Sequence, residues 1–124
     1  MTKSAIAVTN NPKVLESKDI DLEVIFIDST SKDVLIKVRD YIHKGHRLLT
    51  HPLAGSVKPN ETPYETVLVS SKSYGEVDLD SLTLIENSMS TLEKFLNIRK
   101  IPDWSYEVLE DLKLIDYDLI FNYL

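Results

Sequence analysis

The chain of 124 residues is long enough for one domain with a buried core, and its 43% hydrophobic and 27% charged residues exclude a disordered, collagen-like or low-complexity class. The absence of cysteine excludes disulfides, thiolate metal ligands and a cysteine nucleophile. The net charge is −6, and residues 65–124 contribute −7 of it with twelve acidic and five basic residues; such a surface repels the phosphates of nucleic acids.

The chain begins with a pattern of strand, helix and strand. Residues 4–9, SAIAVT, form a short apolar run, and residues 22–28, LEVIFID, have the nearly continuous apolar character of a central parallel strand. Between them, Pro12 suits the first position of a short helix that Asn10 or Asn11 caps. We therefore expect two buried strands joined by a short helix.

The next segment continues this alternation. Residues 29–45 carry apolar side chains at helical spacing, with Thr30 or Ser31 as the N-cap. A third strand is predicted at residues 46–50, HRLLT, and a fourth at residues 65–71, ETVLVSS. Strands that alternate with helices indicate a parallel sheet with right-handed crossovers.

The last part of the chain is helical. Apolar residues recur every three or four positions from Asp78, which predicts a long amphipathic helix. Pro102 ends this pattern, and Asp103 can cap the next helix. Residues 105–124 are predicted as one helix, or as two helices separated near residues 116–117.

These elements predict an α/β fold. We expect a small Rossmann-like three-layer domain covering residues 1–124, with a mostly parallel sheet of about four strands and C-terminal helices. The connection before the fourth strand carries no crossover helix, so that strand can also be antiparallel to its neighbour. No segment approaches the roughly twenty apolar residues of a membrane span, and no apolar leader begins the chain, so we expect a cytoplasmic protein.

Polar side chains follow the first three predicted strands. If those strands are adjacent and parallel, their carboxyl ends form one rim, and two of the polar segments begin helices that favour an anion. The connection after the third strand has three prolines, which indicates an ordered, functional loop. At any single position an asparagine or serine cap is the alternative interpretation. The predicted ligand-binding residues are Asn10, Asn11, Ser29, Thr30, His51, Ser56, Lys58, Asn60, Thr62 and Tyr64.

The residues of this rim suggest several kinds of chemistry. His51 is the natural proton-transfer residue, and Glu61 or Asp28 could orient it. A serine nucleophile at Ser56 lacks the flanking pattern of a nucleophile elbow. The three histidines have no carboxylate at zinc-site spacing, and the loop lacks a phosphate-loop pattern, so we expect neither a metal nor a cofactor.

The segment DYIHKGHRLLTHPLAGSVKPNETPY, residues 40–64, together with VTNNP, residues 8–12, resembles the GrdX family. These are small proteins associated with the glycine reductase system of amino-acid-fermenting anaerobic bacteria. The resemblance covers about the first sixty residues. The family has no established biochemical activity, so the resemblance implies a pathway and a compartment, and no catalytic residues are carried over.

The rim and the resemblance together give a leading hypothesis. We expect a non-catalytic accessory protein of glycine reductase metabolism that binds a small polar or anionic metabolite. One alternative is a small hydrolase or isomerase that uses His51. Another is an interaction module, in which the C-terminal helices form a homodimer or dock onto a glycine reductase component, with Leu92, Leu96 or Trp104 meeting their own copies.

Overall fold

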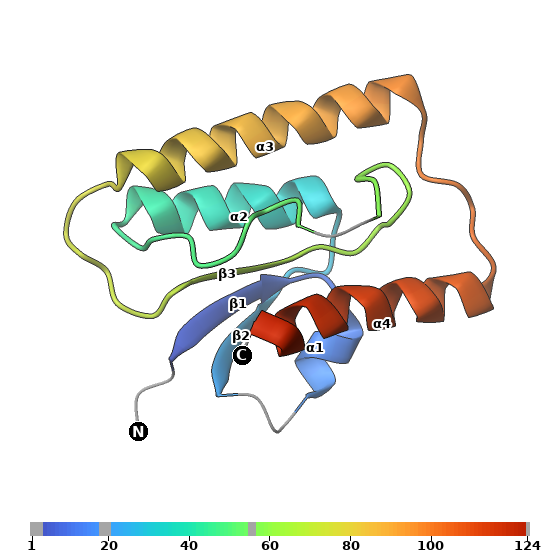
Figure 1. The fold of residues 1–124 in the computed structure, drawn as a ribbon, viewed down its shortest axis with the longest axis horizontal. Coiled ribbons are helices and arrows are strands. Elements are labelled where there is room, and N and C mark those ends of the chain that lie inside the picture. Colours follow the sequence, from blue (N-terminus) through green and yellow to red (C-terminus); the bar gives the residue numbers. More distant parts are fainter. Residues whose placement is uncertain (1–3, 18–20, 55–56, 124) are drawn as a thin grey trace.

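The computed structural model describes residues 4–17, 21–54 and 57–123 of the chain, and Figure 1 shows the fold. The N-terminal part alternates strands and helices, whereas the C-terminal part is two long helices. In chain order the elements are β1 (Ala5–Thr9), α1 (Pro12–Glu16), β2 (Leu22–Phe26), α2 (Ser31–His43), β3 (Thr66–Ser70), α3 (Leu79–Ile98) and α4 (Tyr106–Tyr123).

The sheet has three strands in the order β2-β1-β3. β1 pairs with β2 in parallel, which confirms the predicted pairing of the first two strands, and with β3 in antiparallel orientation. All five residues of β1 and all five of β3 are buried, because helices cover both faces of the sheet. The α/β class is confirmed, but the prediction of a mostly parallel sheet of about four strands is wrong.

The predicted third strand is where the sheet departs from expectation. Residues 46–50 run beside β3, yet they form only one isolated antiparallel bridge, between Leu48 and Val69. The backbone N–H of Leu68 donates to the hydroxyl of Thr50 at 3.0 Å. In a regular antiparallel pair of strands, a backbone carbonyl would accept this hydrogen bond. The connection to β3 contains no helix, and a parallel neighbour would need such a crossover, so β3 runs antiparallel.

The domain has three layers (Figure 1). On one face of the sheet, α2 and α3 cover alternate residues of the strands, such as Ile6 and Val8. On the other face, the small side chains of Ala5 and Ala7 pack in a second cluster with residues of α1 and α4, including Ile120. The two C-terminal helices therefore lie on opposite faces of the sheet.

The first two helices start with predicted caps, whereas the cap of α3 was not predicted. The side chains of Asn11, Thr30 and Asp78 cap α1, α2 and α3 by accepting backbone N–H groups. The prediction that Asp103 caps the last helix is wrong. A turn in which Trp104 N donates to the carbonyl of Pro102 delays the start of α4, and Ser105 Oγ accepts from the N–H of Val108.

No helix of the described residues is long and apolar enough to cross a membrane, and a cytoplasmic location stays a prediction.

The turn after α2 provides a test of the fold. Gly45 has a φ of 100°, and a Cβ there would lie 2.6 Å from Ser73 Oγ and 2.9 Å from Gly75 N. We expect Gly45→Ala to lower the free energy of unfolding in urea by about 2–3 kcal/mol, through backbone strain and overpacking together. Gly75→Ala is the matched control, because Gly75 has a φ of 80° but open space around it. It should lose only about 1–2 kcal/mol, and equal losses in both variants would contradict the role of the close approach.

Candidate functional site

A cleft lies at the edge of the sheet where β1 and β2 end. α1 follows β1 on one face and α2 follows β2 on the other, so the chain leaves two neighbouring strands in opposite directions. Ligands of open α/β sheets bind at such a point. The rim cleft, as we call it, has a volume of about 840 Å³. It is lined by Asn10, Pro12, Phe26, Asp28, Ser29, Thr30, Ser31, Lys32, Pro63, Tyr64, Leu96, Lys100, Ile101, Pro102, Asp103, Trp104 and Leu109.

The N-terminus of α2 forms one wall of the rim cleft. Thr30 Oγ1 accepts the N–H of Asp33 at 3.3 Å, and the hydroxyl of Ser29 donates to the Asp33 carboxylate. The first N–H groups of a helix have no intrahelical partner, so those of Ser31 and Lys32 are left for solvent or a ligand. This arrangement, beside the positive end of the helix dipole, suits an anion.

Asn10 lies beneath the rim cleft and joins three segments of the chain. Its Nδ2 donates to the carbonyls of Ser29 at 3.0 Å and Pro63 at 2.8 Å. Its Oδ1 accepts the N–H of Glu65 at 2.8 Å. The side-chain amide thus forms hydrogen bonds with backbone groups on both sides of β1. Asn10 shapes the cleft, and its direct contact with a ligand stays a prediction.

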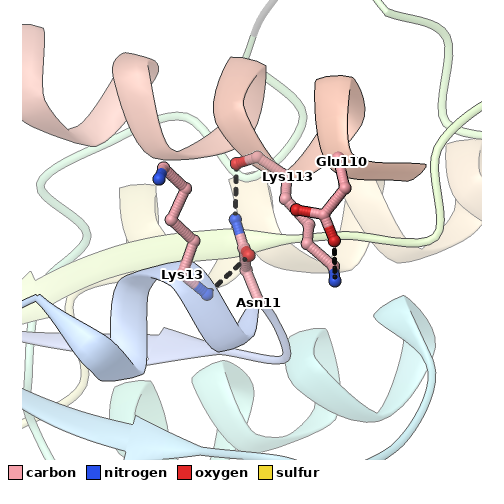
Figure 2. Close-up of polar contacts among 4 residues, drawn as sticks. All are labelled: Asn11, Lys13, Glu110 and Lys113. Carbon is pink, nitrogen blue, oxygen red and sulfur yellow. Dashed lines mark hydrogen bonds and ion pairs between the residues drawn. The ribbon is translucent and has the colours of Figure 1, made fainter. Parts of the chain in front are cut away.

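Asn11 joins α1 to α4, as Figure 2 shows. Its Oδ1 accepts the N–H of Lys13 at 3.0 Å, while its Nδ2 donates to the carbonyl of Lys113 at 2.8 Å and to Asp116 Oδ2 at 3.0 Å. An ion pair between Glu110 and Lys113, at 3.0 Å, lies beside this contact on α4. Asn11 is fully buried and does not line the rim cleft, so its observed role is to fix α4 against the sheet.

A second cavity, the loop cavity, lies between the long loop before β3 and α4. Its volume is about 450 Å³. It is lined by Leu49, Thr50, His51, Leu53, Ala54, Val57, Pro59, Thr62, Tyr64, Glu65, Thr66, Leu112, Ile115, Asp116, Leu119, Ile120 and Asn122. The predicted rim is thus divided between two cavities, and Tyr64 lines both.

Two carboxyl groups line the loop cavity. The Asp116 carboxyl accepts a hydrogen bond from Thr66 Oγ1 at 2.6 Å and one from Asn11, and these bonds partly offset the burial that raises its pKa. Burial raises the pKa of Glu65 well above its ordinary value, and the neighbouring Asp116 raises that pKa further. Among the described residues the Glu65 carboxyl has no hydrogen-bond partner. The cavity therefore holds an acidic pair of which one member is unpaired.

Other predicted site residues serve the structure of the loop. Asn60 Nδ2 donates to the carbonyls of Phe95 at 3.1 Å and Arg99 at 3.4 Å, at the end of α3. The backbone carbonyl of Glu61 accepts the indole N–H of Trp104 at 2.7 Å. Lys58 is exposed and, like Asn60, lines neither cavity. Ser56 lies outside the described residues.

The predicted acid–base pair is not brought together. His51 lines the loop cavity, and its Nδ1 accepts the backbone N–H of Leu53 at 3.0 Å. Asp28 lines the other cavity, and Glu61 lines neither of the two. The structure thus gives His51 none of the carboxylate partners that the enzyme hypothesis requires, and His51 catalysis stays a prediction.

Sequence reasoning missed the two carboxyl groups of the loop cavity. Asp116 had a detectable signal, because it lies four residues from Leu112 and four from Ile120, which are both buried on α4. A carboxylate in the middle of an apolar helix face is unusual in a simple core. Glu65 had no such signal, since its burial depends on the packing of α4 against the loop.

The raised pKa of Glu65 predicts a pH-dependent stability. The folded protein binds the Glu65 proton more tightly than the unfolded chain does. The contribution of Glu65 to the free energy of unfolding is therefore fully present below the ordinary glutamate pKa and is lost as the pH rises through the raised pKa. We expect Glu65→Gln to be more stable than the natural protein in urea at neutral pH, with the gain disappearing in acid.

Exposed Glu93 on α3 provides the control for this measurement. Glu93→Gln removes the same charge without changing the cavity, so it separates a local effect from a change in net charge. A gain of the same size in both variants at neutral pH would contradict the assignment to Glu65.

Comparisons with known proteins place the chain in a family. It is 29% identical over 113 residues to the formate-dependent phosphoribosylglycinamide formyltransferase of Prochlorococcus marinus (strain AS9601), across 89% of this chain and 28% of that protein. The chain thus spans about a quarter of the length of that relative. No solved structure gives a significant match. Residues 6–124 match the family described as GrdX-like protein, so the resemblance extends through both C-terminal helices, and the chain belongs to the GrdX-like protein family.

Proposed function

We propose that this GrdX-like protein is a non-catalytic accessory protein that binds a small polar or anionic metabolite in the rim cleft. The observation that carries the proposal is the position of the cleft. It opens where the chain leaves β1 and β2 in opposite directions, against the N-terminus of the 13-residue helix α2. Backbone N–H groups and the helix dipole at such a point favour a carboxylate or phosphate.

The side chains of the rim cleft narrow the ligand class. Lys32 and Lys100 supply positive charge, whereas Asp28 and Asp103 supply negative charge. This mixture disfavours a highly charged polyanion and suits a small acid of low net charge or a zwitterion. Trp104 adds an apolar surface, so the cleft combines polar anchors with an apolar wall, as small-molecule sites usually do.

The comparisons support the same ligand class. The formyltransferase relative is named for formate and a phosphoribosyl derivative of glycinamide, which carry a carboxylate and a phosphate. This chain covers 28% of that enzyme, so we take from the similarity only the anionic character of the ligand. The resemblance to the GrdX family implies a role in glycine reductase metabolism, where glycine and acetyl phosphate are the first metabolites to test.

A thermal-shift screen tests the proposal with glycine, acetyl phosphate, acetate and formate. A true ligand at one hundred times its dissociation constant should stabilise the fold by about 2.7 kcal/mol and raise the melting temperature by several degrees. We expect Lys32→Ala and Lys100→Ala to weaken the binding about tenfold, or ~1.4 kcal/mol, because each removes a cation from the cleft.

The control variant is Lys94→Ala, because Lys94 is exposed on α3 and lies outside the rim cleft. It should keep the full shift of the natural protein. If none of the four metabolites raises the melting temperature, or if all three lysine variants retain the shift equally, the proposal fails.

Exposed apolar residues favour a second function, that of an interaction module. Leu92 is only 2% exposed and belongs to the core, so the expectation that it meets its own copy is wrong. On α4, however, Tyr106 is 75% and Phe121 58% exposed, and Leu114 lies exposed between them in sequence. We propose that this part of α4 mediates a homodimer or docking onto a glycine reductase component, since exposed aromatic residues are typical interface anchors.

Sedimentation velocity at micromolar concentration tests the dimer. We expect a dimer in the natural protein and a monomer in Phe121→Asp, because a buried interface would have to desolvate the new carboxylate. Asn122→Asp is the matched control, since it adds a charge at the neighbouring exposed position. A monomeric natural protein would remove the dimer, and pull-down of glycine reductase components would then test the docking alternative.

A further inference from the structure

We propose that the loop cavity is a second binding site, which takes a primary alkylammonium ion with a short apolar tail. This site is separate from the rim cleft, and its ligand has the opposite charge. The proposal therefore does not depend on the function proposed for the rim cleft. It rests on the shape of the cavity, on its carboxyl groups and on the absence of a described cation that neutralises them.

The cavity has the size and walls of a small-molecule site. Its volume of about 450 Å³ falls in the usual range of ligand pockets, about 300–1,000 Å³. Leu49 and Leu53 of the loop face it from one side, and Leu112, Ile115 and Leu119 of α4 line the other. These side chains provide an apolar surface for a hydrocarbon tail.

The carboxyl groups supply the polar end of the site. Glu65 and Asp116 both line the cavity and are close enough for the charge of Asp116 to affect Glu65. Among the described residues, both oxygens of Glu65 and Oδ1 of Asp116 lack a hydrogen-bond donor. An ammonium group brings three donors and one positive charge, so it can satisfy both carboxylates at once.

The described cations around the cavity do not take this role. Lys113 of α4 pairs with Glu110 at 3.0 Å and does not line the cavity. His51 lines it, but its Nδ1 accepts the backbone N–H of Leu53 at 3.0 Å, and among the described residues no hydrogen bond joins it to either carboxyl group. An anionic ligand would meet two carboxyl groups, and a neutral apolar one would leave the Glu65 carboxyl without a partner. A cation is therefore the ligand that complements the cavity.

Protonation of the acidic pair then competes with the ligand. Burial and mutual repulsion raise the pKa of Glu65, so in the empty protein this carboxyl holds its proton at a higher pH than an ordinary glutamate. Binding of an ammonium ion displaces that proton. The affinity for the ammonium ion should accordingly rise as the pH increases through the raised pKa of Glu65.

Three probes that differ only in the head group test the proposal on the full chain. Isothermal titration at neutral pH would compare n-hexylamine, which is protonated there, with hexan-1-ol and hexanoate. We expect n-hexylamine to bind at least ten times more tightly than hexan-1-ol, and hexanoate to bind most weakly. Equal or tighter binding of hexanoate, or the absence of binding by n-hexylamine, would overturn the proposal.

Two variants locate the binding. Glu65→Gln should remove the tenfold preference for the amine and leave the affinity for hexan-1-ol unchanged, because the apolar walls are intact. Lys100→Ala in the rim cleft should leave the binding of n-hexylamine unchanged, which separates this site from the one proposed for anions. An amine affinity that is unaffected by Glu65→Gln, or that falls in Lys100→Ala, would show that the amine binds elsewhere.

Discussion

Two adjacent asparagine side chains at the end of β1 hold the layers of this protein together. Asn10 bonds the loop that follows β2 and the segment that enters β3, while Asn11 caps α1 and bonds α4. Each amide uses donors and an acceptor at once, and both residues are buried. The positions of the chain segments around both cavities therefore depend on these two side chains.

This arrangement places two dissimilar cavities on either side of one short segment. Residues 63–66 lead into β3, and their carbonyl and N–H groups are held by Asn10. Tyr64 lines both cavities, whereas Glu65 lines only the loop cavity. The rim cleft presents helix N–H groups, two lysines and two aspartates, and the loop cavity presents the carboxyl groups of Glu65 and Asp116. The segment thus separates the two cavities, with Pro63 on the rim cleft and Thr66 on the loop cavity.

Local signals in the sequence predicted the elements better than their pairing. The caps Asn11 and Thr30, the amphipathic α2 and α3, and the parallel pair β1 and β2 were all predictable, because short-range chemistry and burial on both faces specify them. The prediction of a third strand was wrong, although residues 46–50 have the sequence pattern of a strand. Its ladder depends on β3, which lies some twenty residues later, and the hydroxyl of Thr50 satisfies the N–H of Leu68 instead of a backbone carbonyl. The β-propensity of residues 46–50 could not show that a side-chain hydroxyl would replace a backbone carbonyl as the acceptor.

The site was predictable only in part, for a related physical reason. Polar residues at strand ends predicted a rim where a cleft does lie, but residue type could not show which amides the backbone would occupy. Asp116 was detectable from its place on an apolar helix face, whereas the burial of Glu65 follows from contacts made by α4. Two half-buried carboxyl groups with raised pKa values lower the stability of the folded protein at neutral pH. Apolar residues of similar size would fill the same space without that cost, so packing alone does not account for this pair.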